Sequence, residues 1–229
     1  MKVSVHYDAK YTDNGWVRDR HRSFVRKGQP RNRRAEILRA AQKLMSTQGL
    51  NGVTTRQISR EVGCSEGALY VHFKGRLELL LAMFEESLPD AVESLHRLAD
   101  SSGQASPQLN LVKAITGIHR FHQRAVPLLA GLFAEPKLLA AYRKSLIAHN
   151  KGPHLAIAAL QQYIEVEQKL ARIDTNVDAN LAASMLLSSC FLRAFVEHFF
   201  DRRMRPAWDK FAAQLVGSVI HTTESSTHE

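Results

Sequence analysis

The residues with the clearest chemistry lie between Glu66 and His72, followed closely by Lys74. This short segment combines a carboxylate, a phenol, an imidazole and small apolar side chains. A carboxylate can accept a hydrogen bond from a cytosine amino group, and an alanine or valine can contact a thymine methyl group. If the segment is helical, Leu69 and Phe73 share an inward face because they are four residues apart. The side chains left to face outward belong to Glu66, Gly67, Ala68, Tyr70, Val71 and His72.

Two capped helices must position this segment. Thr54 is placed to cap a first short helix, and Ser65 is placed to cap a second. Between them, Gly63 provides the residue type that ends a helix most easily in the left-handed region. The run from Gly52 to Leu80 therefore predicts a helix-turn-helix, whose second helix enters the DNA major groove. A preceding helix, predicted over 31–48, supplies the apolar floor on which this pair packs.

The same residues resemble the DNA-binding signature of TetR-family transcriptional regulators over residues 33–85. The matching positions, in chain order, are Thr54, Ile58, Ser59, Gly63, Ser65, Tyr70 and Phe73. Arg76 stands where family members usually carry Lys, and Cys64 stands where they usually carry an aliphatic residue. The resemblance implies an all-α fold, with an N-terminal three-helix helix-turn-helix DNA-binding domain and a C-terminal helical ligand-binding and dimerisation domain.

We expect the DNA contacts to come from both short helices and from the residues that follow them. Tyr70 and His72 occupy positions that, by the resemblance, contact phosphate or base, although packing at the helix edge is the alternative for both. Thr54 and Arg56 begin the first helix, where free backbone N–H groups suit the DNA backbone. The full predicted set is Thr54, Thr55, Arg56, Ser65, Glu66, Gly67, Ala68, Tyr70, Val71, His72, Lys74 and Arg76.

Composition and charge favour a basic, helical, intracellular protein. The chain has 229 residues and a net charge of +9, and its 7 prolines and 12 glycines are few enough to favour helix. Residues 1–34 carry ten Lys and Arg against three Asp, so the excess charge precedes the helix-turn-helix. Two cysteines form no metal-binding spacing. The apolar run 181–192 is too short and serine-rich to span a bilayer, and we expect a cytoplasmic location.

Charge, proline and capping patterns give the predicted boundaries. They are a basic arm over 1–30, the helix-turn-helix domain over 31–76, an effector-binding and dimerisation domain over 77–222, and a frayed tail over 223–229. Pro89 predicts a kink or a new helix, and Pro127 predicts the end of the helix that follows Pro107. Thr175 and Asp178 predict a capping box for a helix over 177–201. The final helix is expected to start at Pro206.

The helix predicted over 177–201 is apolar for most of its length, and residues 155–160 in the helix predicted over 154–170 are apolar in nearly every direction. Arg193 and Glu197 are expected to form an exposed pair on the longer helix. Such apolar helices need cover on more than one side, and a second copy of the chain is the economical source. A homodimer would present two reading helices to adjacent major grooves, which predicts a roughly palindromic operator.

The C-terminal domain is also expected, by the resemblance, to hold an unknown small-molecule effector and no cofactor. The side chains that could line its pocket are Phe84, Phe121, His122, Phe133, Tyr142 and Arg143, with ordinary core packing as the alternative for the rings and solvent exposure as the alternative for Arg143. Lys113, Gly117, Arg120 and Arg124 share the opposite side of one helix.

Other functions remain as alternatives. His119 and His122 are three residues apart, but no third metal ligand is visible nearby, so no metal is expected. The chain has none of the glycine-rich phosphate loops or nucleophile motifs of common enzymes. Its 11 histidines leave a helical metal-dependent enzyme as a minor alternative. A DNA-binding dimer without an effector is the other.

Overall fold

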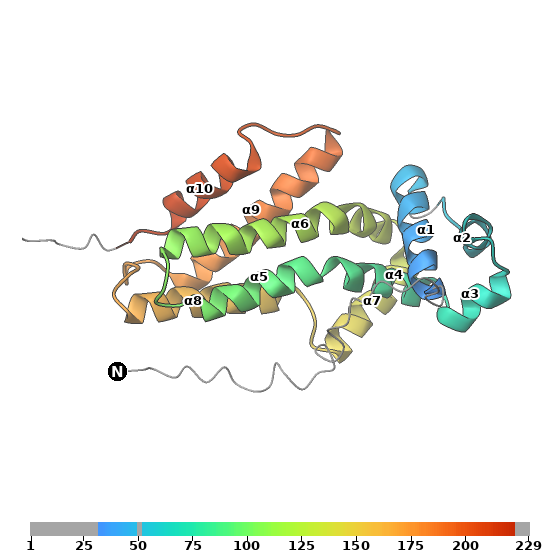
Figure 1. Cartoon of the computed structure of the whole chain (residues 1–229), viewed down its shortest axis with the longest axis horizontal. Helices are drawn as coiled ribbons and strands as arrows, with labels where there is room; N and C mark the ends of the chain where they lie inside the picture. The colour runs from blue at the N-terminus through green and yellow to red at the C-terminus, as the bar shows by residue number, and fades with distance from the viewer. Residues whose placement is uncertain (1–31, 50–51, 223–229) are drawn as a thin grey trace, which may run out of the picture. The chain divides into compact units, whose positions relative to one another are not determined.

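The computed structural model describes residues 32–49 and 52–222, and within these ranges it contains ten α-helices and no β-strand (Figure 1). The expected all-α fold is therefore confirmed. The helices are α1 Arg33–Gln48, α2 Thr55–Val62, α3 Glu66–His72, α4 Arg76–Ser87, α5 Pro89–Asp100, α6 Pro107–Phe133, α7 Pro136–Ala148, α8 Pro153–Lys169, α9 Ala179–Phe199 and α10 Trp208–Val219. The predicted arm over 1–30 and the tail over 223–229 lie outside the described residues.

A first hydrophobic cluster joins α1 to α4. Its fully buried members include Ile37 and Leu38 of α1, Ile58 of α2, Leu69 of α3 and Leu80 of α4. These side chains recur at helical spacing, so each short helix presents one apolar face to the same core. The cluster also takes in residues from the C-terminal end of α6, and residues of α7 pack against it.

A second hydrophobic cluster is built from α5, α6, α8, α9 and α10. Buried residues of α6, such as Leu111 and Ile115, contribute to this cluster, whereas Ala125 and Leu132 of the same helix belong to the first. Because α6 contributes buried residues to both clusters, a movement of α6 would change the packing of both. The boundary predicted at residues 76 and 77 stays a prediction.

Pro89 separates two helices, which resolves the alternatives that its position left open. Helix α4 ends at Ser87, and Pro89 occupies the first turn of α5, where its missing N–H removes no helical hydrogen bond. Arg124 of α6 braces this junction. Its Nη2 donates to the Ser87 carbonyl at 3.0 Å and lies 2.9 Å from the carboxylate of Asp90.

The prediction that Pro127 ends its helix is wrong, because α6 continues through Pro127 to Phe133. A proline inside a helix leaves the carbonyl four residues earlier without its N–H donor. Here that carbonyl belongs to Gln123, and it accepts a hydrogen bond of 2.7 Å from Nε2 of His198 on α9. A side chain 75 positions away thus supplies the missing donor, which offsets part of the cost of the proline.

Two predicted helix starts also need correction. The Asp178 carboxylate caps α9 by itself, accepting from the Leu181 N–H at 2.9 Å, whereas Thr175 lies before the cap. Helix α10 starts at Trp208, two residues after Pro206. In both cases the sequence pattern placed the start of the helix too early by one or two residues.

Arg193 and Glu197 form a buried ion pair, not the exposed pair that we expected. Their side chains are only 7% and 6% exposed, and Arg193 Nε lies 2.7 Å from the Glu197 carboxylate. Arg193 also donates to the carbonyls of Met204 and Pro206, and its guanidinium lies over the ring of Phe211. The chain between α9 and α10 covers the pair, which a helical wheel of α9 alone does not reveal.

Among the described residues, α9 is the one helix whose length and apolar composition would suffice to cross a membrane. Core helices of water-soluble proteins pass the same test, and α9 buries residues such as Ala183, Leu186 and Cys190 against neighbouring helices. Its apolar character therefore has an explanation in packing on one side. Its opposite side is considered below.

Candidate nucleic-acid interface

The turn between α2 and α3 is fixed by caps at three points. Thr54 and Gln57 form a reciprocal capping box: the Thr54 hydroxyl accepts from the Gln57 N–H at 3.2 Å, and Gln57 Oε1 accepts from the Thr54 N–H at 2.8 Å. Gly63 ends α2 in the left-handed region with φ of 72°. Ser65 then caps α3 by accepting from the Ala68 N–H at 3.1 Å. The capping roles predicted for Thr54, Gly63 and Ser65 are confirmed.

Helix α3 is anchored by its inward face. Leu69 and Phe73 are completely buried beside Ile58 in the first hydrophobic cluster. The guanidinium of Arg34 lies over the Phe73 ring, 4.8 Å from its centre. At this distance the cation and the face of the ring attract each other. This anchoring fixes which side of the short helix faces solvent.

The outward face of α3 exposes the side chains that suit DNA. Val71 is 81% exposed and Tyr70 is 49% exposed. Glu66 and Gly67 are also exposed, whereas Ala68 and His72 are half-buried. An aliphatic and an aromatic side chain held in solvent by a well-anchored helix are available for contact with a partner.

Thr55, Glu66 and Tyr70 form a small polar cluster across the two short helices. The Thr55 hydroxyl donates to the Glu66 carboxylate at 2.7 Å, and it lies 3.5 Å from the Tyr70 hydroxyl. The cluster holds the carboxylate and the phenol at the junction of α2 and α3. Glu66 is thus positioned by a neighbour before any partner arrives, which reduces the entropy lost when it makes a contact.

The two predicted phosphate-binding cations have different surroundings. Lys74 is exposed, while its backbone N–H donates to the Glu78 carboxylate at 2.8 Å. Arg76 forms a two-point ion pair with Glu135, at 3.1 Å and 2.7 Å, at the start of α7. The side chain of Arg76 therefore links the first turn of α4 to α7. Its phosphate contact stays a prediction.

Three residues of this interface escaped the sequence analysis. Gln57 was detectable because it stands three residues after Thr54, in the spacing of a capping box. Arg34 and Glu135 carried no such signal, since their partners Phe73 and Arg76 are distant in the sequence. Arg56 is exposed on α2, as its predicted contact with the DNA backbone requires.

The six side chains proposed for the effector pocket have different surroundings. Phe84 and Tyr142 are neighbours, with ring centres 5.2 Å apart, and Phe121 packs against the same cluster. The ring of His122 lies 5.3 Å from Phe121 and 5.6 Å from Phe191. Phe133 and Arg143 are exposed instead. Their role in ligand binding stays a prediction.

His122 gives the protein a predictable sensitivity to acid. Burial, with a smaller contribution from His119, lowers the pKa of His122 from 6.5 to about 4. A histidine with a depressed pKa binds fewer protons when folded, so stability falls as pH drops below the unfolded pKa. Between pH 7.5 and pH 5, His122 alone should lower the free energy of unfolding by about 2 kcal/mol.

The variant His122→Gln should therefore show a flatter dependence of unfolding free energy on pH over this range. Urea denaturation at several pH values measures it. A curve parallel to that of the wild type, offset by a constant amount, would contradict the assignment.

The described part of the chain contains no group of three or more His, Cys, Asp and Glu side chains placed to hold a metal ion. His119 stacks on Trp208 with ring centres 3.7 Å apart, and its Nδ1 lies 3.4 Å from the Cys190 carbonyl. The two histidines thus have surroundings typical of a packed polar core.

Comparison with known proteins bears on this surface directly. The family described as "Bacterial regulatory proteins, tetR family" matches residues 37–83, which contain α2 and α3 entirely. The nucleoid occlusion factor SlmA of Vibrio atlanticus is 38% identical over 85 residues, 35% of this chain and 42% of that protein. The chain thus spans less than half the length of this relative. SlmA of Salmonella paratyphi B is 29% identical over 195 residues, covering 81% of this chain and 96% of the relative.

Solved structures show the same fold at low sequence identity. A TetR-family transcriptional regulator from Mesorhizobium loti superposes with a TM-score of 0.64 at 16% identity, covering 83% of this chain and 97% of its own. The ketosteroid transcriptional regulator of Mycobacterium tuberculosis superposes with a TM-score of 0.60, also at 16% identity, covering 85% and 98%. The similarity extends well beyond the helix-turn-helix.

Proposed function

We propose that this chain is a DNA-binding regulator of the TetR family and not an enzyme, and that it acts as a cytoplasmic homodimeric repressor that binds a palindromic operator and releases it on binding a ligand. One observation carries the DNA-binding part. Helix α3 is anchored by Leu69 and Phe73 while it holds Tyr70 and Val71 in solvent. Such a helix can enter a major groove without any rearrangement of the core.

The DNA proposal is tested by selecting bound fragments from a random pool with the full chain. Enrichment of an inverted repeat, with half-sites about one helical turn apart, is the expected result. Equal affinity for the selected and scrambled sequences at physiological salt would refute the proposal.

Lys74→Gln should weaken binding to every sequence to a similar extent. Loss of one phosphate contact per subunit lowers the slope of log affinity against log salt by about 1 per subunit. Fluorescence anisotropy at several salt concentrations measures both effects. Lys210→Gln, which removes an exposed cation of α10, serves as the control and should leave the slope unchanged.

The dimer proposal rests on the side of α9 that faces away from the core. Exposed apolar side chains recur there at intervals of three, four or seven residues: Leu181, Met185, Leu192, Phe195 and Phe199. They form one stripe along the helix, opposite the buried side. Helix α8 packs against α9 and offers a smaller outward surface around Ala158 and Gln162. A second copy that pairs α8 and α9 with their equivalents would cover the stripe in a four-helix bundle.

Leu192→Asp should therefore produce a monomer, because it places a carboxylate at the centre of the apolar stripe. Sedimentation analysis should show half the wild-type mass. Operator affinity should fall at least tenfold, since each head then binds alone. Leu109→Asp, at an exposed leucine of α6, is the matched control and should stay dimeric. A wild-type protein that is monomeric at micromolar concentration would remove the basis of the proposal.

Ligand response is supported by the connections between the reading head and the body. Helix α4 meets α5 at the Pro89 junction, which Arg124 of α6 braces. Arg76 and Glu135 provide a second link, between α4 and the start of α7. A ligand that changes how α5, α6 and α7 pack would shift the spacing of the two reading helices. A near-complete switch needs about 5.5 kcal/mol of differential affinity for the two states.

A DNA-binding dimer without an effector is a second candidate, favoured by the alignment with a nucleoid occlusion factor along most of the chain. The two candidates differ in how DNA is occupied in cells. A ligand-responsive repressor should occupy a few promoters, while an effector-free factor should occupy many sites. Mapping the bound sites by chromatin immunoprecipitation separates them.

A further inference from the structure

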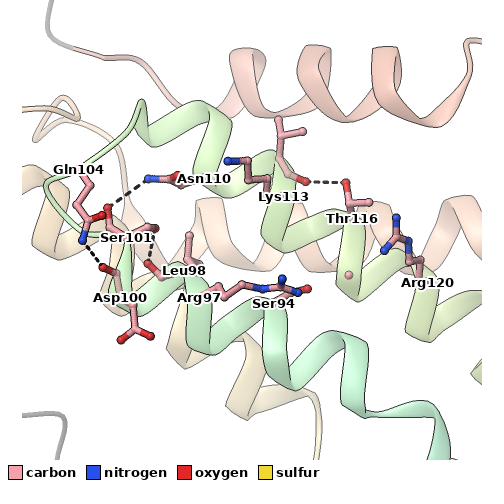
Figure 2. Close-up of a pocket in the computed structure, with 12 residues that line it drawn as sticks. Ser94, Arg97, Leu98, Asp100, Ser101, Gln104, Asn110, Lys113, Thr116 and Arg120 are labelled. Atoms are coloured by element: carbon pink, nitrogen blue, oxygen red, sulfur yellow. Dashed lines mark hydrogen bonds between the residues drawn. The ribbon is translucent and has the colours of Figure 1, made fainter. Parts of the chain in front are cut away.

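Lys113 and Arg120 of α6 line one wall of an open groove between α5 and α6, with a volume of ≈ 620 Å³. Figure 2 shows Lys113, Thr116 and Arg120 along the α6 side and Arg97 on the α5 side. The two helices approach closely at Gly117, where no side chain separates the α6 backbone from Ser94. This close approach forms the floor of the groove.

Charge in the groove is predominantly positive. Among the described residues that line the groove, Arg97, Lys113 and Arg120 contribute cations, and Asp100 is the one carboxylate. Arg97 lies 3.6 Å from Glu93 on its own helix. Lys113 and Arg120 form no ion pair with any residue in the described part of the chain. Two cations on one helix face without counterions favour a negatively charged partner.

The uncharged polar side chains of the groove already donate hydrogen bonds to other groups of the protein. Ser94, Ser101 and Thr116 donate their hydroxyl protons to the carbonyls of Asp90, Leu98 and Val112, respectively. The Asn110 amide donates to the Tyr163 hydroxyl and the Ser101 carbonyl. Gln104 donates to the Asp100 carbonyl.

The strongest donors still available in the groove are therefore the three cations. Of the lining residues that the structure describes, only Leu98 and Val112 have apolar side chains, so an extended hydrocarbon would find little matching surface. The lining instead suits a small molecule rich in acceptor oxygens, because charge-assisted hydrogen bonds to such oxygens are the strong ones.

We propose that the α5–α6 groove binds a small anion with phosphate or clustered carboxylate groups, and that this anion is the effector of the regulator. The inference rests on the proposed function and assigns the effector to a site other than the six side chains considered above. Binding draws Arg97 toward Lys113 and Arg120, which tightens α5 against α6. Arg124 lies one turn beyond Arg120 and holds the α4–α5 junction. The change in α5 is thereby transmitted to α4.

Pyrophosphate is a suitable probe, and its binding to the full chain can be measured by calorimetry at fixed ionic strength. The double variant Lys113→Gln/Arg120→Gln should bind it at least tenfold more weakly than the wild type. The control Lys137→Gln/Lys144→Gln removes the same charge from exposed positions on α7 and should keep the wild-type affinity. Thermal unfolding of each variant establishes that it is folded.

The assignment is overturned if the wild type does not bind pyrophosphate, or if both double variants lose the same affinity. A protein that binds polyglutamate but does not bind pyrophosphate would also overturn the assignment, since the groove would then bind an acidic polypeptide.

A second measurement separates this inference from the proposed function. Pyrophosphate should weaken binding of the selected operator by the wild type, and this effect should be lost in Lys113→Gln/Arg120→Gln. Specific operator binding that is unaffected by groove occupancy would overturn the effector assignment and leave the DNA-binding proposal intact. Pyrophosphate binding in the groove without specific DNA binding would refute the proposed function instead.

Discussion

Replacing Gly117 by Ala is expected to destabilise the protein by about 3 kcal/mol, as overpacking at a close helix contact does. A Cβ atom on Gly117 would lie 1.9 Å from the Ser94 hydroxyl oxygen, 2.6 Å from its Cβ and 2.7 Å from the Asp90 carbonyl oxygen. Two of these atoms belong to the α5 backbone or lie next to it, so rotation of the Ser94 side chain cannot relieve the clash. Helices α5 and α6 must separate instead.

Gly217→Ala is the matched control for this substitution. Gly217 also lies in a helix, α10, but a Cβ there would meet nothing within 4 Å. Alanine at this position should stabilise the protein by up to about 1 kcal/mol through helix propensity. Urea denaturation of both variants measures the contrast. Similar stability of the two variants would show that α5 and α6 are not in close contact at Gly117.

Ser94→Gly combined with Gly117→Ala should recover part of the loss, because it removes two of the three close atoms. The Asp90 carbonyl remains, so full recovery is not expected. The same close approach forms the floor of the α5–α6 groove. A variant that spreads these helices should therefore also weaken pyrophosphate binding.

Glu197→Gln is expected to destabilise the protein by about 3 kcal/mol at neutral pH, because breaking a buried ion pair leaves the other charge uncompensated. Glu197 accepts hydrogen bonds from Arg193, Gln123 and the Met204 N–H. Removal of its charge leaves the Arg193 guanidinium buried among neutral partners, the carbonyls of Met204 and Pro206 and the ring of Phe211. Chemical denaturation at pH 7 provides the measurement.

The exposed pair Glu93 and Arg97 has the same spacing on α5, so Glu93→Gln is the control. It should change stability by less than about 0.5 kcal/mol. Equal effects of the two substitutions would mean that the Arg193–Glu197 pair is not buried in solution.

The effect of Glu197→Gln should also depend on pH. Burial raises the pKa of Glu197, but hydrogen bonds from Arg193 and the Met204 N–H outweigh it, so the pKa lies below its ordinary value. A depressed carboxyl pKa contributes stability above the unfolded pKa and loses it as pH falls through the folded pKa. The difference between wild type and variant should therefore narrow in acid, below about pH 4.

The features that local sequence determines were predicted well. Thr54, Gly63 and Ser65 fix the helix-turn-helix through caps that involve neighbours within three or four residues. The alternation of inward Leu69 and Phe73 with outward Tyr70 and Val71 follows from helical periodicity alone. The resemblance to the TetR family depends on these same local positions, which is why the sequence was enough to identify it.

The errors arose wherever a distant partner decides the outcome. Pro127 should end a helix on local grounds, yet His198 of another helix satisfies the carbonyl that the proline leaves free. Arg193 and Glu197 have the spacing of a surface pair, yet the segment before α10 covers them. The pairing of Arg76 with Glu135 was likewise not predicted, because the two residues are distant in the sequence.

The sequence by itself thus determined that this protein has a capped reading helix, a helical body and prolines at helix starts, because those signals act over one or two turns. Only the tertiary structure decided which charges are buried, where α6 ends and which face of α9 lies open. It also placed the cations of α5 and α6 around one groove. Those outcomes depend on packing between helices that are far apart in the chain. The spacing of residues within one helix does not determine that packing.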